Sequence, residues 1–130
     1  MTWSQRLLAG VFTATGTLHF LHPATYERIM PNYLPAHHEL VLLSGAAEIA
    51  GALGVIPART RRLAGLWLTA TLIAVFPANV HMALHPDRYP DLAPGLLWAR
   101  LPLQALLIWW VLRATRSATE IGPKRNLTAA

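Results

Sequence analysis

The chain has 130 residues, room for one domain, and 54% of them are hydrophobic while only 13% are charged, about half the charged share of a typical soluble domain. Its formal net charge is +5, but the basic residues lie between and beyond long apolar runs and not along one face, so we interpret them as membrane-topology signals and expect no nucleic-acid partner. The absence of cysteine excludes disulfide scaffolds, thiolate nucleophiles and iron–sulfur clusters held by the chain.

The first apolar run, residues 7–21, follows Arg6 and resembles a secretory signal peptide in length. It ends in the sequence HFLHP, however, and not in the small residues of a cleavage site. We therefore predict a first transmembrane helix over about residues 5–22.

Three further apolar runs have the length of about 20 residues that a bilayer crossing requires. They cover about residues 39–56, 62–84 and 94–115, with Pro77 inside the second of them and Pro102 inside the third. Lipid offers no partners to free backbone groups, so each span is expected to be helical. The sequence thus predicts an all-α fold, an integral membrane antiparallel four-helix bundle. The short connections leave too little polar chain to cover a soluble core of the same helices.

The predicted domain organisation is simple. Residues 1–115 form the four-helix transmembrane domain, and the polar residues 116–130 form a cytoplasmic tail that we expect to be disordered. Small residues spaced four apart, such as Gly10 and Ala14 or Gly65 and Thr69, are expected to let helices approach closely in lipid.

The basic residues are distributed unequally between the two sides of the membrane. One side carries eight of them: Arg6, Arg59, Arg61, Arg62, Arg113, Arg116, Lys124 and Arg125. The other side carries three: Arg28, Arg88 and Arg100. The positive-inside rule therefore predicts that both termini are cytoplasmic.

Six polar residues interrupt the spans, and ionisable groups at this depth need a partner or a purpose. In the predicted topology all of them fall between the midplane and the outer surface: His19, Glu48, Asn79, His81, Arg100 and Gln104. Arg100 is the expected partner of Glu48, because a lone carboxylate at that depth is costly. On helix three, Asn79 is expected to face inward and His81 to lie nearer the water.

Two interpretations of this cluster stay open. In one, the polar side chains only fix the order of the helices. In the other, they form the polar floor of a pocket that opens to the outer leaflet and binds a quinone, a lipid or another small amphiphile. The candidate ligand-binding residues of that second interpretation are His19, Glu48, Asn79, Arg100 and Gln104.

Histidine pairs form a second candidate site. His19 and His22 are three apart and His81 and His85 are four apart, spacings that can chelate a metal from a helix. His19 and His81 could also hold a haem between them. No complete ligand set at a known spacing is present, so metal and haem are disfavoured, and the histidines are better explained as interfacial residues near helix ends.

The connection from Pro23 to His38 contains the sequence PNYLP at residues 31–35. Two prolines beside an aromatic and an apolar residue predict a short structured segment on the bundle mouth. It would act as a lid or as a stiff connector, and the sequence does not separate the two.

Several short motifs in the spans resemble those of the small DoxX-like membrane proteins. They are HF at 19–20, Pro23, IMP at 29–31 with LP at 34–35, LV at 40–41, SG at 44–45, Glu48, Pro57, RR at 61–62, VFPAN at 75–79 and RLPLQ at 100–104. The likeness covers about residues 6–112, and the segments FPAN and RLPLQ are its most specific parts. It implies a four-helix bundle in the bacterial inner (cytoplasmic) membrane and a loose association with respiratory or sulfur-linked redox systems.

The resulting functional hypothesis is an accessory subunit of a membrane redox or quinone-linked system, not a stand-alone enzyme, with an outer-half pocket for a small amphiphile. One alternative is a quinone- or metal-dependent oxidoreductase, and another is a membrane assembly or chaperone-like factor. The expected partners are the lipid bilayer, a small amphiphile or quinone, and a partner membrane protein or a second copy of the chain.

Overall fold

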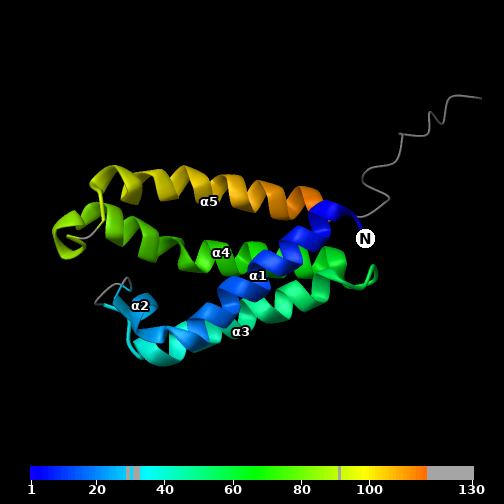
Figure 1. The fold of residues 1–130 in the computed structure, drawn as a ribbon, viewed down its shortest axis with the longest axis horizontal. Coiled ribbons are helices and arrows are strands. Elements are labelled where there is room, and N and C mark those ends of the chain that lie inside the picture. The colour runs from blue at the N-terminus through cyan, green and yellow to red at the C-terminus, as the bar shows by residue number, and fades with distance from the viewer. Residues whose placement is uncertain (29, 31–32, 91, 117–130) are drawn as a thin grey trace, which may run out of the picture.

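A computed structural model describes residues 1–28, 30, 33–90 and 92–116. Within these ranges the chain is helical and contains no strand (Figure 1). The elements in chain order are α1 (Trp3–Leu21), α2 (Pro23–Arg28), α3 (His37–Val55), α4 (Arg61–Leu84), the 3-10 helix η1 (Pro86–Arg88) and α5 (Pro94–Ala114). The all-α prediction is confirmed for this part of the chain, and the four long helices begin and end within two residues of the predicted spans. The predicted tail, apart from Arg116, lies outside the described residues.

Three of the described helices, α3, α4 and α5, are long and apolar enough to cross a membrane. They suggest a membrane protein, as the sequence predicts. The 19 residues of α1 are not among these candidate spans. Its first turn contains Ser4, Gln5 and Arg6, and its second half carries three threonines and His19, so its average hydropathy is lower. Length and composition alone therefore support three crossings and not the predicted four.

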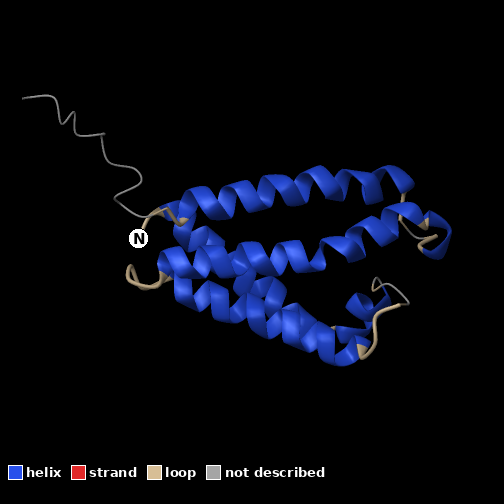
Figure 2. Ribbon diagram, turned by 180° about the vertical axis from the view of Figure 1, so that it is seen from behind, coloured by secondary structure: helices blue, strands red, loops and turns tan. Residues whose placement is uncertain are grey.

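The long helices run in alternate directions and form two pairs, α1 with α3 and α4 with α5, joined mainly through contacts between α3 and α4. We call the end where α1 and α4 begin and α3 and α5 finish the closed end. The opposite end, which contains α2, we call the open end. Figure 2 shows that the two pairs lie close together at the closed end and separate towards the open end, where α2 lies.

The larger apolar cluster lies at the closed end, and a smaller one of Met82, Ala83 and Leu97 joins α4 to α5 at the open end. One core cluster joins all four long helices: Leu8, Phe12, Ala52, Val55, Ala64, Leu68, Leu72 and Val111. Gly65 packs so tightly on Thr115 that a methyl group at this glycine would overlap the threonine side chain. By contrast, a methyl group at Gly10 would meet nothing within 4 Å, so the prediction that Gly10 lies in a close helix contact is wrong.

Polar contacts also fasten the closed end. The side chain of Gln5 donates to the Ala114 carbonyl at 2.9 Å, and the Trp110 indole donates to Ser4 Oγ at 2.8 Å. Arg61 donates to the last carbonyl groups of α3, those of Val55 and Ile56. The bonds of Gln5 and Trp110 hold the beginning of α1 beside the end of α5. The bonds of Gln5 and Arg61 also satisfy carbonyl groups that a helix end leaves free.

Candidate functional site

A partly open cavity of about 950 Å³ occupies the open end, between the two helix pairs and beneath α2. Helices α1 to α5 all contribute to its lining, together with Met30, Tyr33 and Leu34 from the connection that follows α2. The lining includes all the candidate ligand-binding residues expected from the sequence: His19, Glu48, Asn79, Arg100 and Gln104. The structure therefore brings these side chains together, and their role in binding stays a prediction.

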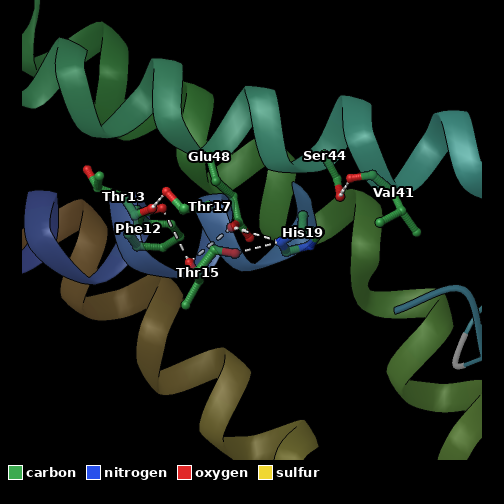
Figure 3. A network of polar contacts seen from close by, with 8 residues as sticks. All are labelled: Phe12, Thr13, Thr15, Thr17, His19, Val41, Ser44 and Glu48. Atoms are coloured by element: carbon green, nitrogen blue, oxygen red, sulfur yellow. Dashed lines mark hydrogen bonds and ion pairs between the residues drawn. The ribbon is translucent and has the colours of Figure 1, made fainter. Parts of the chain in front are cut away.

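Glu48 is the centre of a buried network between α1 and α3 (Figure 3). The Thr15 hydroxyl donates to Glu48 Oε2 at 3.0 Å, and His19 Nδ1 lies 3.6 Å from the same oxygen. His19 Nδ1 also lies 2.7 Å from the Thr15 carbonyl oxygen. Both partners of the Glu48 carboxylate thus come from α1, so the carboxylate has its partners within the protein.

The crossing of α1 and α3 explains why these groups meet. Gly16 and Gly45 face each other at the crossing, and a Cβ at Gly16 would lie 2.7 Å from the Gly45 carbonyl oxygen. Likewise, a Cβ at Gly45 would lie 2.6 Å from the Cβ of His19. Two glycines therefore allow the backbones to approach closely enough for His19 and Thr15 to reach Glu48.

The predicted ion pair between Glu48 and Arg100 is wrong. Arg100 forms neither of the ion pairs found among the described residues, and its guanidinium donates only to the Met82 sulfur, at 3.4 Å. The position of a residue along its predicted span indicates its depth in the membrane, but it does not show which helices are neighbours. Because α1 packs closely on α3 while α5 packs on α4, His19 is nearer to Glu48 than Arg100 is.

Asn79 and Gln104 join α4 to α5 on the opposite wall of the cavity. The Asn79 amide donates to the Gln104 side-chain oxygen, and the Gln104 amide donates to the Leu72 carbonyl. Asn79 lines the cavity as expected. Pro77, within the same stretch of α4, has no backbone donor, so the helix can bend at this point.

Tyr26 is a cavity residue that the sequence reasoning missed. Its ring stacks on the His19 ring, with centroids 3.9 Å apart and planes inclined by 17°. Burial raises the pKa of the Tyr26 hydroxyl, the charge of Glu48 raises this pKa further, and the charge of Arg100 lowers it. The hydroxyl is therefore within electrostatic reach of both charged walls of the cavity. The only sequence signal for α2 is Pro23, a residue favoured in the first turn of a helix.

Hydrogen bonds at the mouth tie α2 to its surroundings. The Tyr89 hydroxyl donates to the Arg28 carbonyl at 3.0 Å, which links α2 to the connection between α4 and α5. His38 Nδ1 lies 2.8 Å from Glu27 Oε1. The helix α2 precedes the predicted PNYLP segment. Residues 33–35 of that segment form a turn and bends, and residues 31–32 lie outside the described part of the chain.

The histidines do not assemble into a metal centre in the described part of the chain. His81 and His85 lie together, with ring centroids 4.4 Å apart, whereas His19 is engaged with Thr15, Glu48 and Tyr26. No group of three or more histidine, cysteine, aspartate or glutamate residues within the described ranges could hold a metal ion.

Large apolar residues border the cavity and remain exposed. Leu43 on α3 is 65% exposed, Trp67 on α4 is 52% exposed and Leu103 on α5 is 62% exposed. These side chains would face lipid acyl chains in a membrane. The cavity therefore combines a polar end near α2 with apolar walls that continue to the sides of the molecule, an arrangement that suits the binding of an amphiphile.

The comparisons with known proteins yield one match. The chain matches a family described as a domain of unknown function (DUF8561) over residues 8–115, which includes every described residue of the cavity lining. No curated protein and no solved structure matches.

Proposed function

The chain belongs to the DUF8561 family, and we propose that it is an integral membrane protein of four transmembrane helices whose open end binds a small amphiphile. The observation that carries this proposal is the cavity of about 950 Å³, whose lining combines polar residues from all four long helices: His19, Glu48, Asn79, Arg100 and Gln104. Its volume falls in the range of about 300–1,000 Å³ of small-molecule sites.

The proposed fourth crossing is α1. This helix has 19 residues, the same length as α3, and it packs along α3 for much of that length. If α3 crosses the bilayer, the paired α1 lies at the same depth. In its second half, Thr15 and His19 line the cavity, while the exposed Thr17 hydroxyl donates to the Thr13 carbonyl. Thr15 and His19 are satisfied there by Glu48 and by backbone carbonyls, so their polarity does not have to face lipid.

The proposed topology has both termini in the cytoplasm of a bacterial cell, with the chain in the inner membrane. Its support is the unequal distribution of the basic residues, together with the hydrogen bonds that place the start of α1 beside the end of α5. The closed end would then lie towards the cytoplasm and the open end towards the outer leaflet.

The proposed biological role is that of a DoxX-like accessory subunit of a redox or quinone-linked membrane system. This part of the proposal depends on the motif resemblance alone. The cavity adds that a quinone or another small amphiphile would have hydrogen-bonding partners at one end and apolar walls at the other. A binding role suits the site better than a stand-alone catalytic one, because the buried carboxylate is already paired within the protein.

The test is native mass spectrometry of the full chain released from nanodiscs. We expect a bound amphiphile with the wild-type protein. Ala74→Trp should displace it, because Ala74 lines the cavity, whereas Ala50→Trp should retain it, because Ala50 is exposed on α3 and does not line the cavity. Equal amphiphile retention by the two variants, or none by the wild type, would contradict the proposal.

A further inference from the structure

The two charged residues of the cavity walls, Glu48 and Arg100, differ in the partners that the protein gives them. On the wall formed by α1 and α3, the Glu48 carboxylate has both the Thr15 hydroxyl and the His19 imidazole as partners. On the wall formed by α4 and α5, the Arg100 guanidinium has the Met82 sulfur, a weak acceptor, and no carboxylate among the described residues. The cavity therefore contains a cation whose charge no carboxylate of the described residues balances.

An unbalanced guanidinium in this position is costly. Arg100 is partly buried and lines a cavity whose neighbouring residues on α5 are mostly apolar, such as Leu103 and Leu107. Within a membrane, such a cation is stabilised by an anionic partner that can accept several hydrogen bonds at once. Tyr26 lines the same cavity as Arg100, and its hydroxyl offers a second donor to the same partner.

The apolar part of the cavity extends away from this cation. The lining residues on α4 run from Trp67 to Asn79, an advance of about 18 Å at the α-helical rise. On α1 the lining continues to Val11 and Phe12, towards the closed end. A ligand whose head lies near Arg100 would thus have room for one extended apolar chain.

We propose that the cavity binds a single-chain amphiphile with an anionic oxygen headgroup, a carboxylate or a phosphate, which Arg100 and Tyr26 hold while the chain lies between the two helix pairs. The ligand enters sideways from the bilayer, because Leu43, Trp67 and Leu103 line the cavity and are also exposed to the surroundings. This inference rests on the proposed function and specifies the chemistry of its ligand.

The test compares ligands that share one acyl chain and differ only in the headgroup. The full-length protein is placed in nanodiscs of palmitoyl-oleoyl phosphatidylcholine and titrated with oleate, with oleoyl lysophosphatidic acid or with uncharged monoolein, and bound ligand is read by native mass spectrometry. We expect at least one anionic ligand to bind about tenfold more tightly than monoolein, the factor expected from a charge-assisted hydrogen bond. The two anionic arms distinguish a carboxylate from a phosphate headgroup.

Variants then assign the preference to one residue. Arg100→Gln should abolish the difference between the anionic ligand and monoolein while monoolein still binds, and Arg100→Lys should retain part of it. Arg28→Gln is the matched control, since Arg28 lies at the same end of the molecule but does not line the cavity, and it should keep the full difference.

Two failures are distinguishable. If monoolein binds the wild-type protein as tightly as both anionic ligands, or if Arg100→Gln leaves the preference intact, the headgroup inference is overturned and the proposed function stands. If none of the three ligands binds, the headgroup inference is overturned. The proposed function is overturned only if the wild-type protein also retains no amphiphile, or if Ala74→Trp and Ala50→Trp retain it equally.

Discussion

The closed and open ends of this molecule are built from the same four long helices but are packed differently. At the closed end, side chains from all four helices form one apolar cluster and glycine contacts bring the backbones together. At the open end, the helix pairs separate around a cavity, and polar contacts join the two helices within each pair. The larger apolar cluster and the cavity thus lie at opposite ends of one fold, so substitutions at the two ends should have different consequences.

The largest effect on stability is expected at the closed end. Gly65→Ala would force a methyl group into Thr115, and overpacking of this kind costs typically 1–3 kcal/mol, so we expect a loss of about 3 kcal/mol. Gly10→Ala is the matched control, because its new methyl group meets nothing within 4 Å and alanine favours the helix. Reversible unfolding in mixed detergent micelles measures both. Equal free energies of unfolding for the two variants would show that the packing at the closed end does not stabilise the molecule.

A smaller effect is expected on the polar wall of the open end. Gln104→Leu removes the bonds to Asn79 and to the Leu72 carbonyl, and interhelical hydrogen bonds in membranes average about 0.6 kcal/mol, so a loss of about 1 kcal/mol is expected. A double-mutant cycle with Asn79→Leu should give a coupling of about 0.6 kcal/mol. A coupling near zero would mean that the two amides do not interact in the membrane.

The smallest effect is expected at the mouth. Tyr89→Phe removes the single bond from the Tyr89 hydroxyl to the Arg28 carbonyl, an exposed bond worth about 0.5 kcal/mol. Hydrogen exchange should become faster in α2 and stay unchanged at the closed end. Tyr33→Phe, at an exposed tyrosine that also lines the cavity, should change neither rate. Faster exchange throughout the chain would instead show that the two ends unfold together.

The sequence predicts the long helices well because their signals are local. Apolar runs of sufficient length, with Pro23 and Pro57 just beyond two of their ends, predict the helix boundaries closely. The short helix α2 has no such signal, since six residues are too few to show a period.

The site is predicted less completely, because its partners are set by packing between helices. The sequence correctly selects polar residues that line the cavity, but it pairs Glu48 with the wrong residue. The actual partner, His19, depends on the close approach of Gly16 and Gly45, and a pattern of single helices does not reveal which glycines face each other. Tyr26 is missed for the same reason, since only the folded chain places it on the His19 ring.

The most direct test of the separation between the two ends is photo-crosslinking in nanodiscs with a single-chain amphiphile that carries a diazirine on its acyl chain, followed by mapping of the labelled residues. We expect labels concentrated on residues that line the cavity, such as Trp67, Val75 and Leu103. Labels spread evenly over exposed apolar residues outside the cavity, such as Leu53 and Leu106, would contradict it.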